Sequence, residues 1–346
     1  MSCALLDESQ TVFLKTSKSL SSQSYQTSPL TDITLCQPSD GYSESEINGV
    51  TFYSISETGD RFSNEDFHVT GRALEFSKQL PGDLLYTAIF DGHGGYECAS
   101  FSSKVLPKSL FSFENLQKSR EKSLFDSFLL TDKKWANFVQ TTNAYTDAGS
   151  TALFALIENK RLIIANTGDS RAILLTSDGV RQISKDHSPS EQSERSRIEN
   201  SGGNIIDDKG VDRVEGVLSL SRALGDLPLK KYVIPDPDLF SYDESASIWG
   251  MVLACDGLWG SLSNEEVQAF IEDSIKRGDI KRGLERLVNE AIERECYDNV
   301  TVTLVLFPGA EKAVMSKTNR EVKVFTNNEA NSNIDDVKTL SMCSIM

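Results

Sequence analysis

The sequence has few residues that bind zinc or form disulfides, and they are scattered along the chain. Its 346 residues include three histidines, at positions 68, 93 and 187, and six cysteines, at positions 3, 36, 98, 255, 296 and 343. No C-x-x-C pair occurs, which argues against a zinc finger and against a disulfide framework. Any metal site must therefore be built mainly from oxygen ligands, and we expect a reducing compartment, the cytosol or the nucleus.

Basic charge and long apolar runs are also lacking. The chain has 35 Lys and Arg against 51 Asp and Glu, a formal net charge of −16. This argues against a partner such as nucleic acid, whose binding would need a basic stripe. No apolar run of about 18 residues predicts a membrane span, and the N-terminus lacks the pattern of a secretory signal. The hydrophobic content of 39% is enough for a packed core.

Signatures of several enzyme classes are missing as well. No cysteine has an arginine six positions later, as a cysteine-dependent phosphatase would require. The chain has no G-x-x-x-x-G-K-[ST] nucleotide loop and no G-x-S-x-G nucleophile elbow. The glycine-rich segment at 91–95 lacks the third glycine of a dinucleotide-binding fingerprint. These absences argue against the corresponding cysteine, nucleotide-loop, dinucleotide and serine-nucleophile chemistries.

Composition divides the chain into three parts. Residues 1–49 are rich in Ser and Thr and predict a flexible tail, and residues 308–346 are again polar. Between them, residues 50–307 are long enough for one large core. Helical patterns are expected at 96–110, 190–200, 264–276 and 281–295, the third opened by a Ser263–Glu266 capping box.

Several β-branched runs in this body stop or start beside an aspartate. Residues 84–90 end at Asp91, 161–168 at Asp169 and 250–255 at Asp256, while 300–307 begin just after Asp298. Such runs predict buried strands. We interpret 171–177 as the arm that returns from 161–168, closed by an Asp178-Gly179 turn. Because strands and helices are segregated along the chain, the pattern predicts an α+β fold.

The aspartates at these strand ends, with the adjacent pair Glu65-Asp66, predict a cluster of carboxylates. Carboxylate oxygens suit Mg²⁺ or Mn²⁺, and two such ions about 3.5–4 Å apart can activate a water and hold a phosphoryl group. Each Asp alone has a simpler interpretation, because Asp followed by Gly or Asn is common in turns. The prediction therefore depends on the whole set.

Eight segments in register resemble the metal-dependent protein serine/threonine phosphatases of type 2C. They cover most of 61–302 and read RFSNED (61–66), FDGHGG (90–95), DAGSTA (147–152), ANTGDSRAIL (165–174), KDHSP (185–189), LSLSRALGD (218–226), VLACDGLWG (252–260) and DNVTV (298–302). The resemblance implies a four-layer α-β-β-α sandwich of two antiparallel sheets flanked by helices. It also implies a two-metal site at one end of the sandwich.

The same resemblance implies metal-binding roles for individual residues. Asp91 is similar to the carboxylate that bridges both metals, and Gly92 to the residue that offers its carbonyl oxygen. The remaining direct or water-mediated ligands would be Glu65 or Asp66, Asp256 and Asp298. Asp169 resembles a ligand of a weaker third metal. The family commonly has Asp where this chain has Gly260, so we expect that third site to be weakened.

Two further residues are implied to act on the substrate. Arg61 resembles the arginine that grips the phosphate through its guanidinium fork. His93 resembles the general acid that protonates the leaving seryl or threonyl oxygen. We expect His68 and His187 to be structural, with His187 pinning the Asp-His-Ser-Pro turn.

The function implied is hydrolysis of phosphoserine and phosphothreonine in phosphoproteins by a water activated between two Mg²⁺ or Mn²⁺ ions. We expect a monomer, with residues 176–245 forming a flap that shapes substrate choice. Two alternatives stay open, an inactive family member that serves as a binding scaffold and a phosphohydrolase of small molecules. Retention of Arg61, Glu65, Asp91, His93, Asp256 and Asp298 favours the active enzyme.

The last four residues, Cys343-Ser344-Ile345-Met346, match a C-a-a-X prenylation signal of the farnesyl type. No polybasic stretch precedes it, and one short lipid anchors a protein only marginally. From this motif we expect weak peripheral association with membranes through Cys343.

Overall fold

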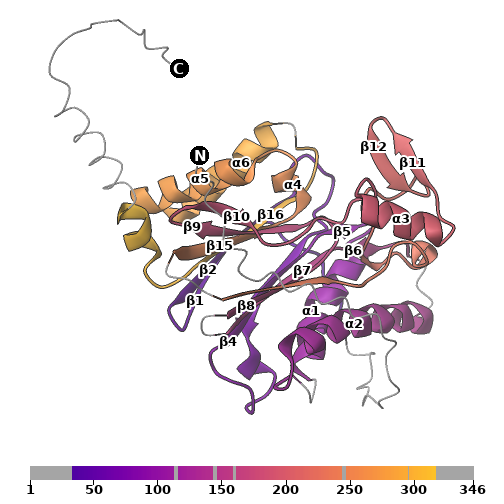
Figure 1. Ribbon diagram of the computed structural model, residues 1–346, viewed down its shortest axis with the longest axis horizontal. Coiled ribbons are helices and arrows are strands. Elements are labelled where there is room, and N and C mark those ends of the chain that lie inside the picture. Colours follow the sequence, from indigo (N-terminus) through magenta and orange to yellow (C-terminus); the bar gives the residue numbers. More distant parts are fainter. Residues whose placement is uncertain are drawn as a thin grey trace, which may run out of the picture.

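Two antiparallel β-sheets pack face to face, and helices cover both outer faces (Figure 1). The structure is a computed structural model that describes residues 33–112, 116–142, 146–158, 161–243, 247–294 and 296–316. Every pairing between neighbouring strands of the two large sheets is antiparallel. The α+β sandwich implied by the resemblance is confirmed.

The first large sheet has six strands, and its outer face carries the helices of the C-terminal half. Its order is β1 (Gly41–Ile47), β2 (Val50–Glu57), β16 (Val300–Leu306), β15 (Ile248–Ala254), β9 (Arg171–Thr176) and β10 (Gly179–Gln182). The helices on it are α4 (Asp256–Trp259), α5 (Asn264–Arg277) and α6 (Ile280–Glu293). The predicted capping box of α5 is present, because Ser263 and Glu266 bond each other's backbone N–H.

The second large sheet has five strands and is covered by two long helices. Its order is β14 (Asp238–Asp243), β8 (Arg161–Thr167), β7 (Ala152–Glu158), β4 (Leu84–Phe90) and β3 (Phe67–Arg72). The covering helices are α1 (Glu97–Phe111) and α2 (Arg120–Thr142), and a 3-10 turn, η2 (Ala73–Glu75), follows β3.

Strand β4 shows why a strand of this sandwich appears in the sequence as an unbroken apolar run. All seven of its residues are buried, because one face packs against α1 and α2 and the other against the six-stranded sheet. Leu85 and Ile89 lie in the core between the sheets, with Phe52 and Met251 from the opposite sheet. A strand buried on both faces has no polar alternation, so it appears in the sequence as a continuous apolar run.

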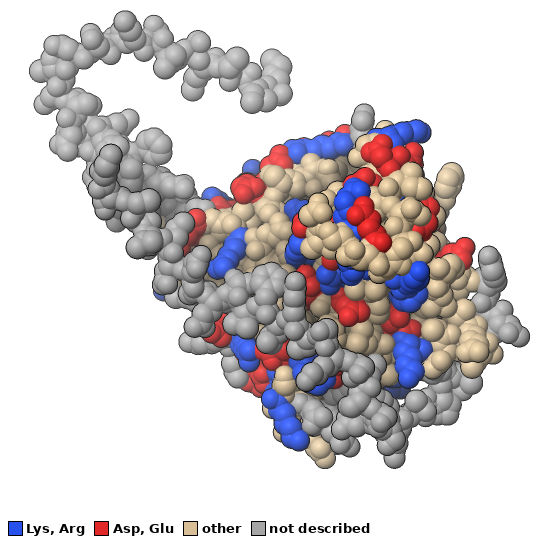
Figure 2. Space-filling view, turned by 45° about the vertical axis from the view of Figure 1, so that its right-hand side comes forward, with Lys and Arg blue, Asp and Glu red and all other residues tan. Residues whose placement is uncertain are grey.

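A smaller region lies beside the sandwich. It contains α3 (Gln192–Asn200), the hairpin of β11 (Ile205–Asp208) and β12 (Val211–Val214), and the 3-10 turn η3 (Leu227–Leu229), around a small core of its own. A short three-stranded sheet, β13 (Leu224–Gly225), β6 (Gly149–Ser150) and β5 (Gly92–His93), joins this region to the sandwich. On the face shown in Figure 2, Lys and Arg side chains are interspersed with Asp and Glu.

Two expectations about the chain's course are wrong. Strand β9 does not return beside β8, since β8 pairs with β7 and β14 while β9 pairs with β10 and β15 in the other sheet. The chain crosses between the sheets at residues 168–170, and the Asp178-Gly179 turn joins β9 to β10 instead. Residues 41–47, expected in the N-terminal tail, form β1 at the edge of the six-stranded sheet.

The described part continues past residue 307 to Ser316, with Ala310 and Val314 buried in the core beneath α5 and α6. Among the described residues, no helix has the length and apolar character needed to cross a membrane. Cys343 lies outside the described residues, so its predicted modification stays a prediction.

Candidate active site and metal centre

A pocket of about 360 Å³ at one end of the sandwich gathers most of the predicted site residues. Eight of them line it: Arg61, Glu65, Asp91, Gly92, His93, Asp169, Asp256 and Asp298. Asp66 is not among the lining residues but lies beside Asp91, directly beneath them. The carboxylates that are distant in sequence therefore meet in one place.

Strand direction explains this meeting. Asp91 and Asp169 follow β4 and β8 of the five-stranded sheet, while Asp256 follows β15 of the six-stranded sheet. Asp298 precedes β16, which runs antiparallel to β15, so that the start of β16 lies beside the end of β15. Carboxylate oxygens of Asp91, Asp169 and Asp256 lie within 4.8 Å of one another. Both sheets thus contribute ligands to a single acidic cluster.

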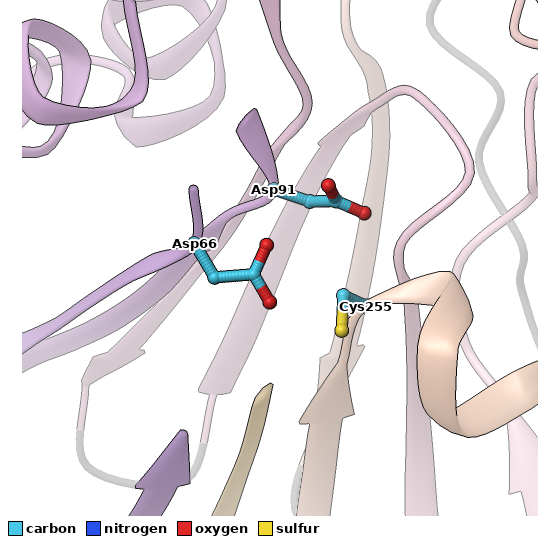
Figure 3. Close-up of side chains that lie close together, drawn as sticks. All are labelled: Asp66, Asp91 and Cys255. Carbon is cyan, nitrogen blue, oxygen red and sulfur yellow. The ribbon is translucent and has the colours of Figure 1, made fainter. Parts of the chain in front are cut away.

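Asp66 is the most deeply buried member of the cluster. Its exposed fraction is 2%, and neither carboxylate oxygen has a hydrogen-bond partner among the residues that the structure describes. Figure 3 shows its carboxylate facing Cys255 and lying next to Asp91. A buried carboxylate without partners is strongly destabilising unless a cation or a proton compensates it. The set of hard oxygen donors around it fits a divalent cation such as Mg²⁺ or Mn²⁺.

Burial and mutual repulsion raise the pKa values of these carboxyl groups. Burial is the main cause for Asp66, whose pKa rises to about 7, and for Asp256, whose pKa rises to about 6. Burial also raises the pKa values of Asp91 and Asp169 well above their usual range, and neighbouring aspartates add to the effect. The cluster therefore disfavours its own full ionisation in the absence of a cation.

These pKa shifts predict a pH dependence of stability for the cation-free protein. The folded state holds protons on Asp66 and Asp256 above the ordinary carboxyl pKa of 3.8, up to about 7 and about 6. Since the folded state then binds more protons than the unfolded state, the free energy of unfolding falls as the pH rises through that window. We expect the melting temperature in chelator to fall between about pH 4 and pH 7.

Saturating Mn²⁺ should abolish or reverse this decline, because the cation replaces the protons. Thermal unfolding followed by circular dichroism at several pH values, with and without Mn²⁺, measures both slopes. A melting temperature in chelator that rises steadily across the window would contradict the interpretation.

Backbone packing around the cluster is tight. A Cβ atom at Gly92 would lie 2.4 Å from the carbonyl oxygen of Glu65, so no side chain fits there. The Glu65 carboxylate accepts a hydrogen bond from the Gly95 N–H at 3.2 Å. The segments that carry Glu65 and Asp91 are therefore held together by direct contact.

Arg61 lies at the edge of the pocket. Its Nη2 is 2.8 Å from Asp298 Oδ2, and its Nε donates to the Tyr297 carbonyl oxygen at 2.6 Å. The side chain is 55% exposed, so part of the guanidinium faces solvent at the pocket mouth. This position is compatible with the predicted contact to a substrate phosphate.

The three histidines lie in different environments, one in the pocket and two outside it. His93 lines the pocket, and its Nε2 is 2.9 Å from both carboxylate oxygens of Asp226. His187 is fully buried, and its Nδ1 accepts from the Gly168 N–H at 3.1 Å, which pins the turn before Asp169. His68 lies in β3, and its Nε2 is 3.5 Å from the Ser43 hydroxyl. The structural interpretation of His187 and His68 agrees with these contacts.

Sequence reasoning misses two residues that build the site. Asn299 accepts the Glu65 N–H at 2.9 Å and donates to the carbonyl oxygens of Thr58 and Ser63, which fixes the loop that carries Arg61 and Glu65. Thr151 accepts the Asp91 N–H at 3.0 Å. Both lie in segments that resemble the type 2C phosphatases, but the resemblance assigned no role to either residue.

The stretch at about 176–245, expected to form a flap, begins in the six-stranded sheet, where β9 ends and β10 follows. Arg213 and Leu218–Leu220 reach the pocket from that stretch. Its last segment, however, forms β14 within the five-stranded sheet and does not belong to a flap.

Comparison with known proteins agrees with this architecture. A family model described as Protein phosphatase 2C matches residues 51–300. "Probable protein phosphatase 2C 71" from Arabidopsis thaliana is 35% identical over 277 residues, which are 80% of this chain and 60% of that protein. "Protein phosphatase 1L" from Bos taurus is 38% identical over 234 residues, 65% of this chain and 64% of that protein. The chain thus spans less than two thirds of the length of either relative.

Solved structures have the same fold. A Caenorhabditis elegans sex determining protein superposes with a TM-score of 0.69 at 26% identity, covering 78% of this chain and 68% of that chain. A serine-threonine phosphatase 2C from Toxoplasma gondii superposes with a TM-score of 0.68 at 19% identity, covering 78% and 99%. Since the family match runs from β2 to the start of β16 and includes all the clustered carboxylates, the chain belongs to the protein phosphatase 2C family.

Proposed function

We propose that this chain is an active phosphatase that removes phosphate from phosphoserine and phosphothreonine in proteins. The observation that carries the proposal is the single pocket in which Arg61 and His93 lie beside carboxylates from both sheets. An inactive scaffold would have no reason to keep a self-repelling, partly buried acidic cluster, because such a cluster costs stability.

Two Mg²⁺ or Mn²⁺ ions are the cofactors we propose. Asp91, Asp256 and Asp298 would hold them directly, with Glu65 or Asp66 and the Gly92 carbonyl completing the site. When bound, such ions acidify a water and offset the negative charge of the phosphoryl group.

The other steps of the reaction are carried out by side chains of the protein. Arg61 donates from its guanidinium to the phosphate oxygens and orients the group at the pocket mouth. His93 gives a proton to the seryl or threonyl oxygen as it leaves, because an alkoxide is a poor leaving group without one. Arg213 and Leu218–Leu220 border the pocket and contact the polypeptide that carries the phosphate.

Hydrolysis of a phosphothreonine peptide tests the proposal. We expect release of phosphate with Mn²⁺ or Mg²⁺ and none after chelation. Comparison with small phosphate monoesters distinguishes the remaining alternative, since a small-molecule phosphohydrolase would prefer them. Lack of metal-dependent turnover on any phosphopeptide would support the scaffold alternative instead.

Gly260 gives a prediction about metal requirement. It caps the C-terminal end of α4 with φ −69°, and a Cβ there would lie 3.1 Å from the Asp256 carbonyl oxygen, a contact that a small shift relieves. Gly260→Asp would add a carboxylate on the helix that begins with Asp256. We expect it to lower the half-saturating Mn²⁺ concentration for activity by about 10-fold.

Gly260→Asn is the matched control, because it adds nearly the same volume without the charge. Metal titrations of activity for both variants and the wild type give the comparison. Equal half-saturation for all three proteins would remove the idea that Gly260 weakens a third cation.

A further inference from the structure

Three short strands bring His93 close to an acidic residue that the proposed chemistry has not yet used. In the sheet β13-β6-β5, His93 pairs with Gly149, and Gly149 pairs with Gly225 on its other side. Asp226 follows Gly225 directly. The side chains of His93 and Asp226 therefore approach each other across the backbone of Gly149.

The contact between them is close and sheltered. His93 Nε2 lies 2.9 Å from both Oδ1 and Oδ2 of Asp226. The Asp226 side chain is 4% exposed, whereas that of His93 is 23% exposed and lines the pocket. No other hydrogen bond to the Asp226 carboxylate is found among the described residues. Among the described residues, the His93 imidazole is thus the hydrogen-bond partner of this carboxylate.

The surrounding backbone is specialised for this contact. Asp226 has φ 48° and ψ 45°, a left-handed conformation that non-glycine residues rarely adopt. At Gly149, a Cβ atom would lie 2.1 Å from Asp226 Oδ2 and 2.3 Å from His93 Nε2. Any side chain at position 149 would occupy the space between the two groups, so glycine is required there. The absence of a side chain at position 149 leaves the space in which the two groups meet.

We propose that Asp226 is a positioning residue that fixes the His93 ring for proton transfer to the leaving oxygen. This inference rests on the proposed function and deepens it. The carboxylate accepts a hydrogen bond from Nε2–H, which leaves Nδ1 as the ring nitrogen that serves the substrate. Gly149 makes the contact sterically possible.

The step balances with water as the only co-reactant. A water oxygen bonds to phosphorus, and the bond from phosphorus to the seryl or threonyl oxygen breaks with its electron pair on that oxygen. The oxygen takes the proton from His93 Nδ1 and leaves as the alcohol. The proton released by the attacking water passes through solvent and restores the imidazolium.

A comparison of leaving groups tests the inference. A threonyl alkoxide needs a proton to leave, whereas p-nitrophenolate is a stable anion that leaves without one. We expect Asp226→Asn to lower kcat for a phosphothreonine peptide by about 10- to 100-fold, and kcat for p-nitrophenyl phosphate by less than about 3-fold. A residue needed only for folding or for metal binding would lower both rates together.

Three further single variants and one double variant separate the positioning role from general damage. His93→Gln should produce the same selective loss, and adding Asp226→Asn to it should leave the ratio of the two rates unchanged. Asp238→Asn is the matched control, because Asp238 pairs with His187 at 3.3 Å and neither residue lines the pocket. It should leave the rate ratio at the wild-type value. Gly149→Ala would place a methyl group between His93 and Asp226, so it should reproduce the selective loss.

The possible failures are distinguishable. If the wild type hydrolyses neither substrate with Mn²⁺, the proposed function fails. If the wild type is active but Asp226→Asn changes both rates equally, or neither, the positioning role is overturned while the phosphatase stands.

Discussion

Asp91→Asn is expected to lower phosphopeptide hydrolysis by on the order of 10³-fold or more, while it stabilises the cation-free protein. Asp91 lies at the centre of the cluster, within 4.8 Å of Asp66 and Cys255 on one side and of Asp169 and Asp256 on the other. Its loss removes a carboxylate that belongs to both groups of candidate metal ligands and would hold a cation in each. The asparagine side chain is neutral, so it does not replace the negative charge of the lost carboxylate, and the residues around it do not replace it either.

The stabilising part of this prediction comes from the same geometry. Burial and the charges of Asp66 and Asp256 raise the Asp91 pKa well above its usual range, which shows that the folded structure disfavours its ionised form. A neutral amide of the same size relieves this repulsion. We expect a gain of about 0.5–2 kcal/mol in the free energy of unfolding in chelator at neutral pH.

Two measurements check both parts. Phosphate release with Mn²⁺ gives the activity, and thermal unfolding in chelator gives the stability. Asp83→Asn is the control, since Asp83 is exposed and does not line the pocket. Turnover close to that of the wild type in Asp91→Asn would contradict the assignment of the metal centre, whatever its melting temperature.

Arg61→Ala is the second large effect that we expect. The guanidinium contributes charge-assisted hydrogen bonds to the phosphate, and losing even one costs about 1.5–3 kcal/mol, so kcat/KM for a phosphothreonine peptide should fall by at least about 10- to 100-fold. In the structure Arg61 also bonds to Asp298 and to the Tyr297 carbonyl, which hold it at the pocket mouth.

Arg61→Lys separates the charge from the fork. Lysine keeps the positive charge but cannot make two parallel hydrogen bonds, so it should recover only part of the loss. Inorganic phosphate as a product inhibitor gives an independent readout, because its inhibition constant should rise in both variants. If phosphate inhibits Arg61→Ala as strongly as the wild type, Arg61 does not bind the phosphoryl group.

The strands that carry the metal ligands could be predicted because burial on both faces leaves a simple signal. β4, β15 and β16 are almost entirely buried, and each appears in the sequence as an apolar run beside an aspartate. The antiparallel register of β15 and β16 places Asp256 beside Asp298, and the packing of the two sheets adds Asp91, which the sequence alone could only suggest. The resemblance to a known family supplied the roles.

Strand β1 could not be predicted from hydrophobicity, because five of its seven residues are exposed and its sequence is polar. The available signal was the Asn48-Gly49 turn, in which both residues have positive φ and join β1 to β2 as a hairpin. The crossing of the chain between the sheets at 168–170 was hidden for a different reason. Two consecutive apolar runs look alike whether they pair with each other or with other strands.

Asp226 and Asn299 show a further limit. Both act on neighbours that are more than a hundred positions away, His93 at 133 and Glu65 at 234. Neither belongs to a pattern whose spacing predicts a contact. Only the fold shows that Asp226 contacts His93 and that Asn299 fixes the loop that carries Arg61.

The division of the acidic ligands between the two sheets has a consequence for how long the protein survives in a cell. A cation held by Asp91 from one sheet and Asp256 from the other would link the two layers at that end of the sandwich. Opening of the sandwich then requires release of the ion, so the opened population falls in proportion to cation occupancy. Depletion of free divalent ions should therefore make the chain susceptible to proteases as well as catalytically inactive.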